Sequence, residues 1–197
     1  MKKLTAILLM LMAIRVAVAQ EDPISEFYGM KFGSTKAQVM AKMTNKGYKP
    51  KNNNPTSLMY EEVKFLNKEV DMIFKFVDDE LFEGIVLFTP DLESQLIRMY
   101  RSISDDVRMK YGKGQDFEIY DYPYEKGDGH ELTAIRIGKA QFTTYWMGQN
   151  TAGTDGKEPN TISLEIRPKG YIALTYQDSA RVDKVIARQN SEKMEEL

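Results

Sequence analysis

His130 is the side chain in this sequence best suited to acid–base chemistry or metal binding, and it is the chain's one histidine. It lies between Asp128 and Glu131 in the stretch EKGDGHE, where the three side chains could form a metal or acid–base site. One histidine cannot make a multi-histidine zinc site, and glycine with aspartate is typical of a solvated turn. We therefore interpret residues 125–131 as a loop between two strands. The sequence predicts no catalytic residue, no metal site and no cofactor.

Other common catalytic motifs are missing from the sequence. It contains no serine in a Gly-x-Ser-x-Gly elbow, no phosphate-binding P-loop and no Gly-x-Gly-x-x-Gly motif after a strand. The absence of cysteine excludes thiol catalysis, thiolate metal sites and disulfides. Acidic pairs such as Asp105–Asp106 could serve glycoside cleavage, but their positions are typical of solvent-exposed helix faces and turns. A hydrolase would require a pocket with two converging carboxylates, one with a raised pKa.

A row of tyrosines is the strongest candidate for a binding surface. In the strand predicted at residues 115–123, alternation puts Phe117 and Ile119 on one face and the tyrosines on the other. If Phe117 and Ile119 belong to the core, the tyrosines stand on the outer face. The strands predicted at residues 132–138 and 140–147 add an arginine and a tryptophan. The candidate binding residues are Tyr120, Tyr122, Tyr124, Arg136 and Trp146.

Two alternatives for this surface stay open. Tyrosine, tryptophan and arginine are enriched in recognition surfaces, because they bury a large area at low entropic cost. The row could also be ordinary core, covered by a helix or by the C-terminal segment. Strand 140–147 contributes either Trp146 or the pair Tyr145 and Met147, depending on which face is exposed.

The elements that position these residues follow a repeated plan of one helix and then several strands. The first helix begins at Thr35, which has capping-box spacing to Gln38, or at Ser34, and it ends at Gly47. The second begins near residues 89–91 and ends at Gly112, and a third begins at residue 178 or 179. The remaining segments alternate as strands do. The predicted strands are residues 58–66, 69–77, 81–89, 115–123, 132–138, 140–147, 161–167 and 170–177.

This order predicts an α+β fold. Because strands follow one another without intervening helices, the sheet is antiparallel, with about seven to eight strands and three helices on one side. We expect a single domain over residues 20–190, built from two helix-then-meander units at residues 27–89 and 90–177. Residues 191–197 are expected to form a frayed tail.

The N-terminus predicts export. Residues 1–19 combine a basic start, an apolar stretch and a small-residue cleavage site, as in a secretory signal peptide. Cleavage leaves 24 basic and 29 acidic residues, so the formal net charge falls from −2 to −5. This acidic chain without a basic cluster argues against nucleic acid as a partner. We expect a periplasmic or secreted protein with no stable membrane insertion after signal cleavage.

Both ends of the chain resemble a group of small exported proteins that are common in Bacteroidetes. The resemblance rests on GMKFGS at residues 29–34, Val39, KGY at 46–48, ISLEI at 162–166, Gly170 and LTYQD at 174–178. The helix-then-meander repeat is also similar to the beta-lactamase inhibitory protein fold and to small outer-membrane assembly lipoproteins. The chain lacks the lipid-attachment cysteine of those lipoproteins. The resemblance therefore implies a fold rather than an activity.

These observations favour a secreted, non-enzymatic binding module that recognises a protein or an envelope component. One alternative is a hydrolase of envelope or glycan polymers. Another is a small-ligand carrier with a cavity lined by methionine and aromatic side chains.

Overall fold

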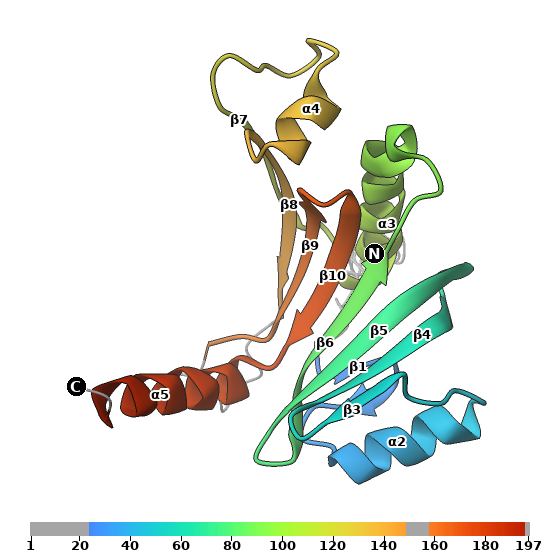
Figure 1. The fold of residues 1–197 in the computed structure, drawn as a ribbon, viewed down its shortest axis with the longest axis vertical. Coiled ribbons are helices and arrows are strands. Elements are labelled where there is room, and N and C mark those ends of the chain that lie inside the picture. The colour runs from blue at the N-terminus through green and yellow to red at the C-terminus, as the bar shows by residue number, and fades with distance from the viewer. Residues whose placement is uncertain (1–23, 149–157, 196–197) are drawn as a thin grey trace, which may run out of the picture.

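The computed structural model describes residues 24–148 and 158–195, so the predicted signal peptide lies outside the described residues. Its centre is one eight-stranded antiparallel sheet in the order β3-β4-β5-β6-β10-β9-β8-β7 (Figure 1). The strands are β3 (Asn52–Asn54), β4 (Ser57–Phe65), β5 (Lys68–Val77), β6 (Glu80–Phe88), β7 (Gln115–Tyr120), β8 (Ala140–Met147), β9 (Thr161–Arg167) and β10 (Tyr171–Gln177). The predicted α+β class is therefore confirmed.

The remaining elements are a small hairpin and the helices. The hairpin consists of β1 (Glu26–Phe27) and β2 (Met30–Lys31). The helices are α2 (Lys36–Asn45), the 3-10 turn η1 (Glu93–Gln95), α3 (Leu96–Tyr111), α4 (Glu131–Arg136) and α5 (Ser179–Glu195). Each half of the chain contributes a long helix and four strands of the sheet, and the last strands of the two halves, β6 and β10, pair at its middle.

Helix α2 is determined by its local sequence. Thr35 accepts a hydrogen bond from the Gln38 amide (3.3 Å), and the Gln38 side chain accepts one from the Thr35 amide (2.9 Å). This is the predicted capping box, with Thr35 rather than Ser34 as the cap. At the other end Gly47 has a φ of +90°, and the Tyr48 amide donates to the Met43 carbonyl (3.0 Å). Both predicted ends of this helix are confirmed.

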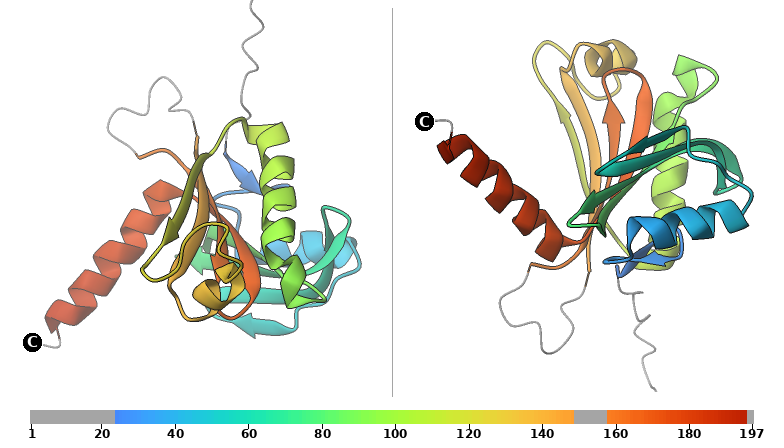
Figure 2. Two further views of the ribbon diagram at one scale, coloured as in Figure 1. Left: turned by 90° about the horizontal axis from the view of Figure 1, so that it is seen from above. Right: turned by 60° about the horizontal axis from the view of Figure 1, so that its bottom comes forward.

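The helices divide the sheet into a covered face and an open face. Figure 2 shows α2 and α3 on one side of the sheet, while α5 extends away from the other side. Helix α3 buries its apolar stripe, including Tyr100, Ile103 and Val107, against the covered face. Helix α5 is held to the turn between β5 and β6 by ion pairs from Arg181 to Glu80 (2.9 Å) and from Arg188 to Asp78 (2.5 Å). The hydrophobic core therefore lies between the covered face and the first two long helices.

Two predicted elements differ from the structure. Residues 132–138, expected as a strand, form helix α4 and its terminal turn, in which the Ala134 and Ile137 amides donate to the carbonyls four residues earlier, at His130 and Thr133. A short apolar run cannot be assigned to a helix or a strand from its period alone. The eighth strand is β3 instead, whose residues are not among the predicted strands.

Two helix boundaries also differ. Helix α3 begins at Leu96, after η1, rather than near residues 89–91, and its N-cap position carries no side-chain hydrogen bond. Helix α5 continues to Glu195, so it includes residues 191–195, which the sequence assigned to a polar tail.

Candidate functional site

The cross-strand register decides which face each candidate residue occupies. Phe117 lies opposite Thr143 on β8, while Trp146 and Thr144 occupy the alternate positions on that strand. Thr144 faces helix α3, because its hydroxyl hydrogen-bonds the Tyr100 hydroxyl (2.7 Å). Side chains alternate between the faces of a strand, so Trp146 shares the covered face with Thr144 and Phe117 lies on the open face.

The structure does not bring the five candidate residues together on one face. Tyr120 is half-buried on the covered side, where its ring packs against Phe142 with 5.9 Å between centroids. Trp146 is buried in the core and donates its indole N–H to the Gly112 carbonyl (3.1 Å). Tyr120 and Trp146 therefore pack into the core. This agrees with the alternative in which the aromatic row is covered by a helix.

The other three candidates lie at the end of the molecule beyond β7. Tyr122 is 91% exposed, and Tyr124 is half-buried in the loop that leads to α4. Arg136 lies on α4, and its guanidinium makes two hydrogen bonds of 2.6 Å to the Glu93 carboxylate. None of the three extends the face of the sheet.

The open face instead carries an apolar cluster at its β7–β8 edge, which we call the open-face patch. It consists of Phe117, Ile119, Tyr145 and Met147, which are 36%, 50%, 39% and 64% exposed. The Phe117 and Tyr145 rings meet edge to face with 5.9 Å between centroids. The alternation of residues predicted that Phe117 shares a face with Ile119, and Tyr145 with Met147. It did not predict which face of the sheet these two pairs occupy.

The rest of the open face is polar at its centre and apolar again on the far half. Its central strands present half-buried Ser163 and Thr175, which lie opposite each other on β9 and β10. Next to them the buried Glu83 carboxylate forms an ion pair with Lys75 (2.5 Å) and accepts a hydrogen bond from the Gln177 side-chain amide (2.5 Å). On strands β5 and β6 this face also carries the half-buried apolar side chains Ile73, Ile85 and Leu87, of which Ile85 lies directly opposite Thr175.

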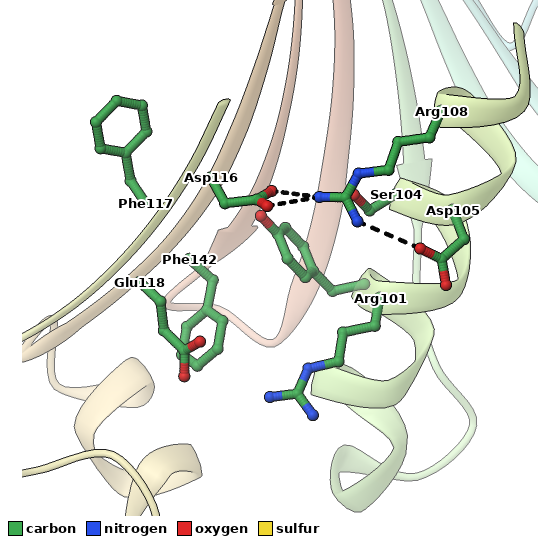
Figure 3. Close-up of a pocket in the computed structure, with 9 residues that line it drawn as sticks. Arg101, Ser104, Asp105, Arg108, Asp116, Phe117, Glu118 and Phe142 are labelled. Atoms are coloured by element: carbon green, nitrogen blue, oxygen red, sulfur yellow. Dashed lines mark hydrogen bonds and ion pairs between the residues drawn. The ribbon is translucent and has the colours of Figure 1, made fainter. Parts of the chain in front are cut away.

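A second feature is a cleft of about 280 Å³ on the covered side, between helix α3 and strand β7, which we call the α3–β7 cleft (Figure 3). Its lining residues are Tyr100, Arg101, Ser104, Asp105, Arg108, Asp116, Phe117, Glu118 and Phe142. One end is bridged by Arg108, which holds Asp116 through two hydrogen bonds of 2.5 and 2.7 Å. Asp116 also accepts a bond from the Thr144 hydroxyl (2.8 Å).

The carboxylate of Glu118 at the other end of the cleft is also engaged. Burial alone would raise its pKa, but hydrogen bonds from Lys126 (2.8 Å) and Tyr120 (3.0 Å) hold that pKa below its usual value. Glu118 is therefore an ionised acceptor at neutral pH, not the proton donor that a glycosidase needs.

Tyr100 gives the cleft a measurable alkaline response. Its burial raises the pKa of its hydroxyl to about 12, from 10.0, against the opposing effect of the Thr144 hydrogen bond. As the pH rises, the unfolded chain therefore loses this proton before the folded chain does. We expect the folded state to lose about 1 to 2 kcal/mol of stability between pH 10 and about pH 12. Urea unfolding across this pH range measures the slope. Tyr100→Phe should reduce the slope without abolishing it, because burial also raises the pKa of Tyr60, Tyr120 and Tyr176. Tyr122→Phe should leave the slope unchanged; equal slopes in both variants would contradict the assignment.

The carboxyl group with a raised pKa lies elsewhere. Burial, with the nearby Glu61 carboxylate, raises the pKa of Asp71 above its usual value. Asp71 shares a hollow of about 170 Å³ with Glu62 and Glu69, which is smaller than most small-molecule sites. Among the described residues no three histidine, cysteine, aspartate or glutamate side chains are grouped closely enough to hold a metal ion.

A third cleft bears on the small-ligand alternative. It has a volume of about 260 Å³, lies beside the C-terminal half of α3, and is lined by Tyr28, Phe65, Tyr111 and Tyr176 among others. No methionine belongs to this lining, whereas Met43 and Met72 are fully buried in the core. Met43 and Met72 therefore fill the core and do not line this cleft.

Comparison of the sequence with protein-family models and with curated proteins found no match. Within residues 24–148 and 158–195, no helix combines the length and the apolar character that crossing a membrane requires.

Proposed function

We propose that this protein is an exported, non-enzymatic binding module that recognises a protein or an envelope component through the open face of its sheet. The observation that supports this proposal is the open-face patch, where four large apolar side chains remain accessible beside a polar sheet centre. Contiguous exposed apolar surface on a soluble domain usually marks an interaction site. An apolar core with a polar surround is also the usual composition of a protein interface.

The family resemblance and the periplasmic or secreted location belong to the same proposal. An exported module needs a partner outside the cytoplasm, so envelope proteins are the class to test first. The hydrolase alternative has one supporting observation, the raised pKa of Asp71, but its hollow is small and separate from the open-face patch.

The test is to disrupt the patch without disturbing the core. We expect the double substitution Phe117→Ser with Tyr145→Ser to weaken capture of the partner from solubilised envelope extract by about tenfold, because buried aromatic residues dominate interface energies. Captured proteins are quantified by mass spectrometry against the unaltered chain. Met109→Ser is the matched control, since Met109 is 81% exposed on α3, away from the open face.

Two readouts make the result decisive. The double variant should stay folded in thermal unfolding and lose about 1 to 2 kcal/mol of stability, because both side chains are more than a third exposed but their rings pack against each other. If the double variant captures the same proteins in the same amounts as the Met109→Ser control, the open-face patch is not the binding surface.

A further inference from the structure

The α3–β7 cleft contains two buried polar groups that have no hydrogen-bond partner among the described residues. They are the Ser104 hydroxyl and the Arg108 Nε–H. Ser104 is 2% exposed, and Figure 3 shows it next to Arg108, on the side of α3 that faces β7. A buried polar group without a partner costs stability, and a bound molecule that supplies the missing hydrogen bond removes that cost. These two groups therefore indicate a polar ligand.

The charges at the cleft select a neutral ligand. The charged residues that line it or pair with its lining are Arg101, Asp105, Arg108, Asp116, Glu118 and Lys126, three of each sign. Arg108 pairs with both aspartates, and Lys126 pairs with Glu118 (2.8 Å). Arg101 interacts electrostatically with Glu118 from the opposite wall. A ligand with a net charge would meet as many like charges as opposite ones, so neither sign is favoured.

The free hydrogen-bonding capacity of the cleft includes both donors and acceptors. The Arg101 guanidinium donates no hydrogen bond to any described residue. Asp105 accepts one through a single carboxylate oxygen, from Arg108, so its other oxygen remains available within the described chain. A hydroxyl is a neutral group that donates and accepts through one oxygen. A molecule with several hydroxyls would therefore satisfy the arginines and the carboxylates together.

The size and the base of the cleft suit a single ring. Its volume of about 280 Å³ is just below the range of about 300 to 1,000 Å³ that is usual for small-molecule sites. Tyr100 and Phe142 are its buried aromatic members, and their rings meet edge to face with 6.0 Å between centroids. The cleft therefore combines an apolar base with a charged rim. A pyranose sugar has the matching division, an apolar C–H face bordered by hydroxyls.

We propose that the α3–β7 cleft binds one neutral sugar ring, which is either a free saccharide or one unit of an envelope glycan. Arg101 and Arg108 donate to its hydroxyls, and the Ser104 hydroxyl bonds a further one. The carboxylates of Asp105 and Glu118 accept from the same hydroxyls through charge-assisted hydrogen bonds. This site lies on the covered side of the sheet, so it goes beyond the proposed function and does not depend on it.

The test uses methyl glycosides of glucose, galactose, mannose and N-acetylglucosamine, titrated into the full chain labelled with ¹⁵N. We expect at least one to bind with a Kd of about 1 to 10 mM, as suits a ligand of about a dozen heavy atoms. The NMR shifts should concentrate at the amides of Arg101, Ser104 and Glu118. Methyl glucuronoside and glucosamine, which carry opposite charges, should bind no more tightly than the neutral glycoside.

Matched pairs of variants test the two donors on α3. The Ser104 hydroxyl bonds no described residue, so Ser104→Ala should keep Tm or raise it by about 3 °C while weakening the sugar about fivefold. Ser102→Ala is its control, and Arg98→Met is the control for Arg101→Met, because both control residues are exposed on α3 and do not line the cleft. Arg101→Met keeps the apolar stem and should weaken binding about tenfold.

The source of the sugar is distinguished by length. The β-linked trimer of the preferred sugar should bind about tenfold more tightly if the site takes a glycan unit, since the neighbouring rings reach the rim, and equally if it takes a free saccharide.

Several outcomes would overturn the proposal. They are no shift with any glycoside at about 50 mM, or equal affinities of Arg101→Met and Arg98→Met. A tenfold preference for the glucuronoside would identify an anion site, and N-methylacetamide that binds as tightly as the sugar would identify a site for peptide groups. A loss of Tm in Ser104→Ala with unchanged affinity would make that hydroxyl structural and remove it from the site. None of these results decides the proposed function, because capture of an envelope protein by the open-face patch is a separate readout.

Discussion

Replacing Gly84 with alanine is expected to destabilise the protein by about 3 kcal/mol, although only one methyl group is added. Gly84 lies on the covered face of β6, and a Cβ atom there would come within 2.0, 2.2 and 2.4 Å of three atoms of the Phe27 ring. The ring cannot move aside easily, because it is 1% exposed and packs against Phe74 (5.1 Å between centroids) and Tyr176 (5.4 Å). The requirement is for space and not for a special backbone angle.

The cost should depend on Phe27 in a measurable way. Phe27→Ala alone is expected to cost about 4 kcal/mol, because it leaves a cavity under the first hairpin. In that background the ring that clashes with Gly84→Ala is gone, so the second substitution should add little. Urea unfolding of the two single variants and the double variant gives a coupling energy of about 3 kcal/mol. Additive costs would show that the Phe27 ring does not rest on Gly84.

The features that the sequence predicted correctly depend on local chemistry. The ends of α2 need only a side chain and an amide a few residues apart, as with Thr35 and Gln38, and a glycine with positive φ at Gly47. The antiparallel sheet follows from strands in succession. Helix-end residues and a succession of strands are both read from short stretches of sequence. The α+β class could therefore be predicted from the pattern alone.

The errors arise where a distant contact decides the outcome. Asp116 and Glu118 lie on the side of β7 that faces helix α3, where Arg108 pairs with Asp116 and Lys126 pairs with Glu118. The period of β7 was recognised correctly, but its two faces were indistinguishable without knowing where α3 lies. The α3–β7 cleft could not be predicted for the same reason, since its residues come from α3 and from strands that follow it in the chain.

Trp146 separates the sequence hypothesis from the structure most sharply. As a member of an exposed aromatic row it would bind a partner and contribute little to stability. In the structure it is 3% exposed, and its ring lies so close to Gly114 that a Cβ atom there would approach it to 2.7 Å. We therefore expect Trp146→Ala to cost about 4 kcal/mol and to lower Tm by about 12 °C. Far-UV circular dichroism is the suitable measurement, because the substitution removes the chain's one tryptophan.

Two further variants assign that cost to its causes. Trp146→Phe keeps an aromatic ring but loses the N–H that donates to Gly112, so we expect an intermediate loss of about 2 kcal/mol. Tyr122→Ala, at the most exposed tyrosine of the predicted row, should change stability by less than about 0.5 kcal/mol. If Trp146→Ala instead unfolded like the unaltered chain and lost its envelope partner, the aromatic row would be the binding surface and the packing of β8 against α3 would be wrong. The same substitution therefore decides between a core and an interface, because burial makes a side chain indispensable to the fold and exposure makes it available to a partner.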